Sequence, residues 1–127
     1  MTAIVIFLQI ALGGLLTFNF ITPESHILTG LLVLILAIGC MVFALVSKPA
    51  FRPLQGLSVA LVVLIVIQAI LGFATLSNGS QVIAWIHLVN AIAIYGMALS
   101  GTFMAMRWDR ISATQPAKVR DQLAQIA

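Results

Sequence analysis

The stretch from His26 to Val46 reads HILTGLLVLILAIGCMVFALV and contains no Asp, Glu, Lys or Arg. Its length is close to the roughly 20 predominantly apolar residues that a helix needs to cross the hydrocarbon core of a bilayer. Three further stretches have the same character, and they run from Ala3 to Phe20, from Leu54 to Leu76 and from Val82 to Met106. The sequence therefore predicts an all-α integral membrane protein in which four transmembrane helices form a bundle.

The composition of the whole chain agrees with this prediction. Of the 127 residues, 62% are hydrophobic and 7% are charged. A soluble domain carries about 25% charged residues, so this chain has too few charges to cover a surface that faces water. A soluble globular protein and a disordered chain are both excluded, and membrane lipid is the expected surrounding. No cluster of basic residues with interleaved aromatic residues is present, so no nucleic-acid partner is expected.

The positions of Lys and Arg predict the orientation of the helices. The second predicted loop carries Lys48 and Arg52, whereas the first and third loops carry no Lys or Arg. The remaining cations follow the fourth stretch, at Arg107, Arg110, Lys118 and Arg120. Because cytoplasmic segments are enriched in Lys and Arg, we expect a multi-pass protein of the cell (plasma) membrane with both termini in the cytoplasm.

The chain divides into two parts at the end of the fourth stretch. We expect residues 1–106 to form one transmembrane domain and residues 107–127 to form a cytoplasmic tail. Pro116 can begin a short helix in this tail, with an apolar face of Val119, Leu123 and Ile126. A helix on the membrane surface and a frayed, solvated tail both remain open.

Polar and small residues recur at a fixed spacing and indicate an internal repeat. Gln9 and Gln68 are 59 positions apart (68 − 9), as are Gly13 and Gly72. His26 and His87 are 61 positions apart (87 − 26), as if the third loop had gained two residues. We therefore expect two copies of one helical hairpin, related by an axis along the membrane normal. Chance similarity among apolar helices is the alternative.

Two histidines are the main candidates for chemistry. The predicted helices contain no Asp, Glu, Lys or Arg, which argues against a proton pump, a channel with charged rings or a coupled transporter. The repeat places His26 and His87 at equal depth near the outer face, on helices that can face each other across a bundle. Two opposed imidazoles suit the axial positions of a heme iron. The sequence therefore predicts one heme b, with iron ligated by His26 and His87.

Small residues lie on the same faces as the two histidines and can make room for a flat porphyrin. The predicted cofactor-binding positions are Gly30 and Ala37 below His26, Ala91 and Ala98 below His87, and Gly13 and Gly72 on the other two helices. Cys40 continues this face and is expected to be a small core residue. Ordinary packing of small residues between membrane helices is the alternative for any one of these positions.

Gln9 and Gln68 are predicted to lie near mid-membrane. Each can form a hydrogen bond across the bundle or to a backbone carbonyl, and contact with a cofactor is the alternative. The outer loops lack cations for the heme propionates. We expect the N-terminal ends of the second and fourth helices, together with neutral side-chain donors, to take that role.

Three segments together resemble the heme A synthase family: Gln9 with Leu12-Gly13-Gly14, Gln68–Thr75, and Ile86–Ala91. Members of that family have eight helices in two similar halves, each with a histidine pair on its second and fourth helices. The resemblance implies that this chain is similar to one half, with His26 and His87 in the ligand positions, and that copies pair as a homo-oligomer. The family has a catalytic Glu before the first histidine, and Glu24 is the nearest match.

Three functions follow from these expectations. The first is a heme b-binding membrane protein with a low-spin, bis-His heme near the outer leaflet, acting in electron transfer or as an accessory subunit of a respiratory complex, with quinol as a candidate partner. The second is a heme A synthase-like enzyme that oxidises a heme methyl group with help from Glu24. The third is a structural membrane subunit without a cofactor.

Overall fold

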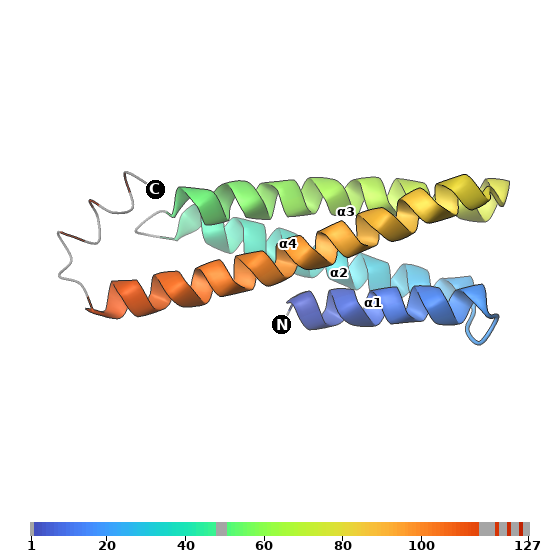
Figure 1. Ribbon diagram of the computed structural model, residues 1–127, viewed down its shortest axis with the longest axis horizontal. Helices are drawn as coiled ribbons and strands as arrows, with labels where there is room; N and C mark the ends of the chain where they lie inside the picture. The colour runs from blue at the N-terminus through green and yellow to red at the C-terminus, as the bar shows by residue number, and fades with distance from the viewer. Residues whose placement is uncertain (1, 48–50, 115–118, 120–121, 123–124, 126–127) are drawn as a thin grey trace.

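The computed structural model describes residues 2–47 and 51–114, together with 119, 122 and 125. The described chain forms four helices, α1 (Thr2–Thr17), α2 (Pro23–Val46), α3 (Arg52–Asn78) and α4 (Gln81–Thr114), and these ranges contain no strand. The predicted all-α four-helix bundle is confirmed (Figure 1).

Each helix packs against two neighbours. Helix α1 contacts α2 and α4, and α3 contacts the same two helices. Helices α2 and α4 therefore lie diagonally across the bundle, on either side of its axis. The connections from α1 to α2 and from α3 to α4 lie at the same end of the bundle, and α2 meets α3 at the opposite end (Figure 1). This arrangement brings the N-terminal ends of α2 and α4 to one end.

Three of the helices are long and apolar enough to cross a membrane, which indicates a membrane protein: α2, α3 and residues 81–111 of α4. Helix α1 is apolar but has 16 residues, so it is about 24 Å long, against about 30 Å for the hydrocarbon core. It runs along only part of the bundle (Figure 1). The sequence predicts a full span at this position, and the helix is shorter than that prediction.

The first helix ends at Thr17 because the chain turns at Asn19. This residue has a φ of 59°, in the left-handed region that Asn tolerates better than most residues. Its N–H donates to Leu16 O at 3.0 Å, and the Phe20 N–H donates to Leu15 O at 3.0 Å. These bonds satisfy carbonyls of the last turn, so the apolar residues up to Phe20 leave the helix.

The third connection is short, so the prediction that it gained two residues is wrong. It consists of residues 79–80. Gly79 has a φ of 61°, and its N–H donates to Thr75 O at 3.0 Å, which ends α3 with a left-handed cap. The connection from α1 to α2 spans residues 18–22. The additional residues of the second hairpin therefore extend its helices.

The buried core follows the internal repeat. Three pairs of core residues have the spacings of 59 or 61 positions found for Gln, Gly and His. These pairs are Ile6 and Ile65, Val33 and Ile94, and Ala37 and Ala98. Equivalent positions of both hairpins therefore face the same axis, as the predicted duplication requires.

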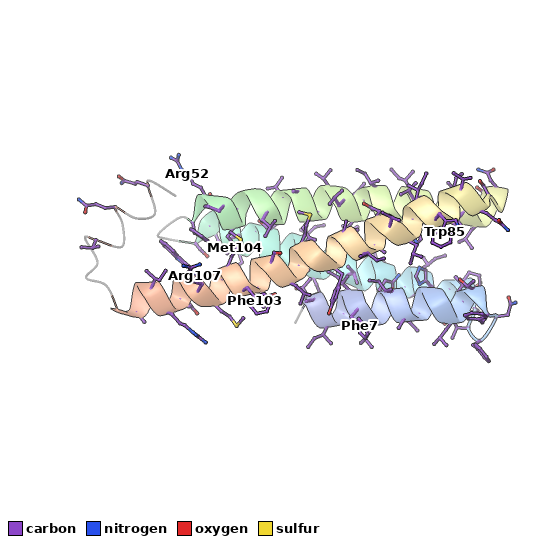
Figure 2. The ribbon with its side chains drawn as sticks, in the orientation of Figure 1. Phe7, Arg52, Trp85, Phe103, Met104 and Arg107 are labelled. Atoms are coloured by element: carbon purple, nitrogen blue, oxygen red, sulfur yellow. The ribbon has the colours of Figure 1, made fainter. Side chains whose placement is uncertain are left out.

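Two arginines lie at the other end of the bundle. Arg52 and Arg107 lie there, whereas Trp85 lies at the opposite end (Figure 2). The Phe51 and Trp108 rings stack with centroids 4.6 Å apart, which joins the start of α3 to the distal part of α4. Helix α4 continues beyond the predicted end at Met106, so Arg107 is helical. Pro116, where the tail helix is predicted to begin, lies outside the described residues.

Candidate functional site

The structure brings the two predicted histidines together. His26 lies in the first turn of α2 and His87 in the second turn of α4. Their ring centroids are 6.4 Å apart, with an angle of 65° between the ring planes. Both side chains are half-buried. The diagonal relation of α2 and α4 thus places two imidazoles opposite each other at one depth.

A glutamine from the preceding helix holds each histidine. Gln9 Nε2 on α1 donates to His26 O at 2.8 Å and lies 3.3 Å from His26 Nε2. Gln68 Nε2 on α3 donates to His87 O at 3.0 Å and lies 3.2 Å from His87 Nε2. The predicted hydrogen bond to a backbone carbonyl is confirmed for both glutamines, and contact with a cofactor stays a prediction.

These contacts define which ring nitrogen carries the proton. A backbone carbonyl only accepts, so the amide nitrogen is the atom that faces it. The second N–H of the same amide then points at the ring, and histidine Nε2 must accept it. In this arrangement each neutral ring carries its proton on Nδ1, and its Nε2 lone pair accepts the amide N–H. Both Nδ1 atoms, and Gln9 Oε1, are buried without a hydrogen-bond partner among the described residues.

Gly13 and Gly72 allow the helices that carry the glutamines to approach the rings. A Cβ on Gly13 would lie 3.2 Å from His26 Cε1, and a Cβ on Gly72 would lie 3.2 Å from His87 Cε1. Such a distance is closer than ordinary van der Waals contact, so a larger residue would displace the ring. These glycines, predicted to make room for a flat cofactor, make direct room for the imidazoles.

A cavity of about 770 Å³ adjoins both histidines and is lined by all four helices. Its wall is mostly apolar, and the small residues Gly30 and Ala91 contribute to it, as do Gly13 and Gly72. Val33 and Ile94 lie on the wall one to two turns further along α2 and α4. The cavity thus combines two imidazoles with an apolar enclosure.

Ala37 and Ala98 lie beyond this cavity and do not line it. They are 1% and 7% exposed and pack in the core cluster. The spacing along each helix correctly places them on the inward face. However, Val33 and Ile94 come between them and the histidines, so their observed role is packing in the core of the bundle.

Two further predicted positions face away from the site. Glu24 is exposed in the first turn of α2 and is absent from the cavity wall. An acidic side chain is stabilised at this position by the helix dipole. Cys40 is exposed, with its Sγ 3.2 Å from Thr2 Oγ1, so the prediction of a core cysteine is wrong.

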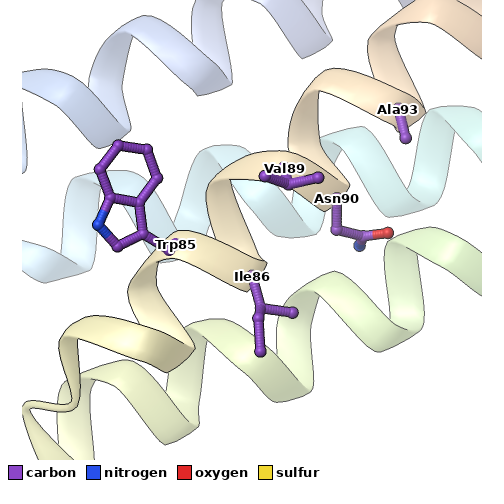
Figure 3. A pocket seen from close by; sticks show the side chains of 5 residues that line it. All are labelled: Trp85, Ile86, Val89, Asn90 and Ala93. Carbon is purple, nitrogen blue, oxygen red and sulfur yellow. The ribbon is translucent and has the colours of Figure 1, made fainter.

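Asn90 belongs to the site and is not anticipated by the sequence prediction. Its Nδ2 donates to Gln68 Oε1 at 2.7 Å and to Leu64 O at 3.2 Å. Figure 3 shows Asn90 on the side of α4 that faces α3, beside a shallow groove of about 430 Å³ that includes Trp85. The feature of the sequence that could have pointed to Asn90 is its position three residues after His87, within Ile86–Ala91, one of the three segments that carry the family resemblance.

The described residues offer a pair of ligands and no larger group. Within them, no three residues among His, Cys, Asp and Glu lie close enough to share a metal ion. The donor set at this site therefore consists of two neutral imidazoles. Such a set can supply two of the coordination positions of a metal whose remaining ligands come from elsewhere.

Comparison of the chain with protein-family models, with curated proteins and with solved structures finds no match. The resemblance to the heme A synthase family stays a prediction. The function is therefore argued from the histidine pair and its surroundings.

The tight glycine contacts predict a specific effect of a single methyl group. Gly72→Ala should shift the Cε1–H signal of His87 in NMR spectra of the protein, because the added Cβ meets that atom, and Gly13→Ala should do the same to His26. Gly14→Ala is the matched control, since nothing lies within 4 Å of its added Cβ. It should leave both signals in place and cost no stability, because Ala is favoured over Gly in a helix by roughly 0.5–1 kcal/mol. Equal shifts in the Gly13 and Gly14 variants would contradict the contact.

Proposed function

We propose that this chain binds one heme b through His26 and His87 and acts in one-electron transfer within a membrane. The observation that carries the proposal is the pair of half-buried imidazoles, with ring centroids 6.4 Å apart, on the wall of a cavity. A neutral imidazole supplies the nitrogen lone pair that a metal ion requires, and a metal at Nε2 would replace the N–H that Gln9 or Gln68 donates there.

The separation of the rings suits a shared metal ion. An imidazole nitrogen binds a metal at about 2.0 Å, and the ring centre lies about 1 Å further away. Two rings on opposite sides of one ion therefore have centres about 6 Å apart. Direct edge-to-face contact between two rings also falls within about 4.5–7 Å, so the choice depends on the surroundings of the rings.

The surroundings favour the metal. The adjoining cavity of about 770 Å³ lies within the range of about 300–1,000 Å³ typical of ligand and cofactor sites. Direct ring contact would leave the cavity without a role. A flat, apolar cofactor bound by both imidazoles would fill the cavity and would explain why two polar rings lie on its wall.

The residues of this chain would act on the cofactor in three ways. His26 and His87 would hold the heme iron, and a heme iron held by two imidazoles supplies low-spin, one-electron chemistry. Gln9 and Gln68 would keep the rings oriented through their bonds to the histidine carbonyls. The apolar wall would exclude water, which is one means by which a protein sets a heme potential.

Neutral groups would receive the propionates. The site lies near the end of the bundle at which α2 and α4 begin, and Thr17, Thr75 and Gln81 line the cavity. Free N–H groups at helix N-termini favour anions. We therefore propose that the carboxylates point toward this end.

The same chemistry suggests partners and an alternative. We propose a quinol, a respiratory complex or a second copy of this chain as the electron-transfer partner. The alternative of heme methyl oxidation needs an acid or base beside the cofactor. Glu24 is exposed and off the cavity wall, so electron transfer is the better-supported function.

For location, we propose the plasma membrane with both termini in the cytoplasm. Arg52 and Arg107 lie at the same end of the bundle (Figure 2), which agrees with the enrichment of cations on the cytoplasmic side. The histidines, near the other end, would then lie close to the outer leaflet.

Visible difference spectra test the proposed ligands. The purified full chain supplied with heme b should give the reduced-minus-oxidised spectrum of a six-coordinate, low-spin b-type heme. His26→Ala and His87→Ala should each reduce that signal roughly tenfold or more, because even the loss of groups that only support a ligand costs 10–100-fold in affinity. Leu28→Ala is the control, since Leu28 is two residues after His26 but is 67% exposed and does not line the cavity. A low-spin spectrum that survives in both histidine variants would refute the assignment.

Cysteine labelling tests the proposed orientation. In a Cys40→Ala background, a membrane-impermeant maleimide added to intact cells should label Ser80→Cys, in the connection from α3 to α4. It should label Lys48→Cys only after the cells are permeabilised, because positive segments stay in the cytoplasm. The opposite pattern would place the histidines near the inner leaflet.

A further inference from the structure

The two halves of the site differ in one hydrogen bond. The Gln68 amide is satisfied at both ends, since its nitrogen donates to His87 O at 3.0 Å and its Oε1 accepts from Asn90 Nδ2 at 2.7 Å. Gln9 makes the equivalent bond to His26 O at 2.8 Å, but its Oε1 is buried without a partner among the described residues. The symmetry of the histidines therefore does not extend to the groups that hold them.

The repeat identifies the residue that causes this difference. The position equivalent to Asn90 is Thr29 (90 − 61), three residues after His26, as Asn90 is three residues after His87. The Thr29 hydroxyl donates to Ser25 O within its own helix. The side chain at this position on α2 thus bonds within α2, whereas the one on α4 reaches across to α3.

An amide bound at both ends is fixed, and an amide bound at one end is less so. A buried acceptor without a partner raises the free energy of its conformation, so Gln9 gains by rotating toward any other donor. Rotation removes the N–H that His26 Nε2 accepts, and the ring is then no longer restricted to one tautomer. Asn90 prevents the same event at Gln68.

We infer that Asn90 is a positioning residue that makes the two histidines unequal, with His87 the fixed ligand and His26 the exchangeable one. The difference between the two rings is a property of the chain without heme. The difference between a fixed and an exchangeable ligand rests on the proposed heme binding. In the loaded protein, His26 Nε2 would leave the iron more readily than His87 Nε2, with no change in oxidation state.

The first test uses the full chain in lipid nanodiscs without heme. The chain has only two histidines, so labelling histidine with ¹⁵N gives two sets of ring signals, assigned with His26→Ala. We expect the nitrogen shifts of a single Nδ1–H tautomer for His87 and of a mixture of tautomers for His26. Identical behaviour of the two rings would overturn the inference.

Two substitutions exchange the properties of the rings. Asn90→Leu should convert His87 to a mixture of tautomers and leave His26 unchanged. Val89→Leu, at an exposed neighbour, should change neither ring.

Thr29→Asn places an amide at the equivalent position on α2, where it can donate to Gln9 Oε1, and should restrict His26 to one tautomer. Because Thr29→Asn adds a hydrogen bond, this test does not require the protein to fold after losing one. Failure of both Asn90→Leu and Thr29→Asn to move their rings would overturn the inference.

The second test measures heme loss from the loaded chain to an excess of apomyoglobin. The protein that keeps only His26 (His87→Ala) should lose heme roughly tenfold faster than the one that keeps only His87 (His26→Ala), as expected when a supporting hydrogen bond is missing. Adding Asn90→Leu to His26→Ala should remove that difference. Equal rates in the two single variants, including complete loss from both, would contradict unequal ligands. A wild-type chain that takes up no heme would instead contradict the proposed function, and the ring-nitrogen spectra would still decide the inequality.

Discussion

The contact between a glutamine amide and a histidine, made once in each hairpin, is the interaction on which the site depends. A glutamine inside a membrane helix needs a partner, because lipid offers none. Gln9 and Gln68 each find that partner in the carbonyl and the ring of a histidine on the next helix. One amide therefore joins two helices, sets the depth of the imidazole and donates an N–H to its Nε2 lone pair.

Duplication turns this local contact into a site. One hairpin presents a single imidazole, and the second hairpin places another opposite it because α2 and α4 lie diagonally across the bundle. Gly13 and Gly72 bring α1 and α3 close against the two rings. Ala37 and Ala98 pack in the core further along the axis. The cavity lies between these regions of close packing, where the side chains around the histidines leave space.

Sequence patterns predict part of this arrangement and miss the rest for identifiable reasons. Hydropathy predicts the four helices because each is a long apolar stretch. The spacings of 59 and 61 positions predict that His26 and His87 pair, because the repeat places them at equal depth. The end of α1 depends on the left-handed turn at Asn19, and periodicity carries no information about that turn. The inward direction of Ala37 and Ala98 is predictable, but the depth at which Val33 and Ile94 close the cavity depends on packing between helices. The bond from Asn90 to Gln68 likewise depends on how α4 sits against α3.

The most direct measurement of the central claim is the hyperfine spectrum of the ferric, heme-loaded chain prepared with ¹⁵N-histidine. Because the chain has two histidines, every histidine coupling to the iron comes from His26 or His87. We predict directly coordinated nitrogens from both rings in the wild-type protein. Couplings from one histidine or from none would contradict two imidazoles that bind one iron from opposite sides of the bundle.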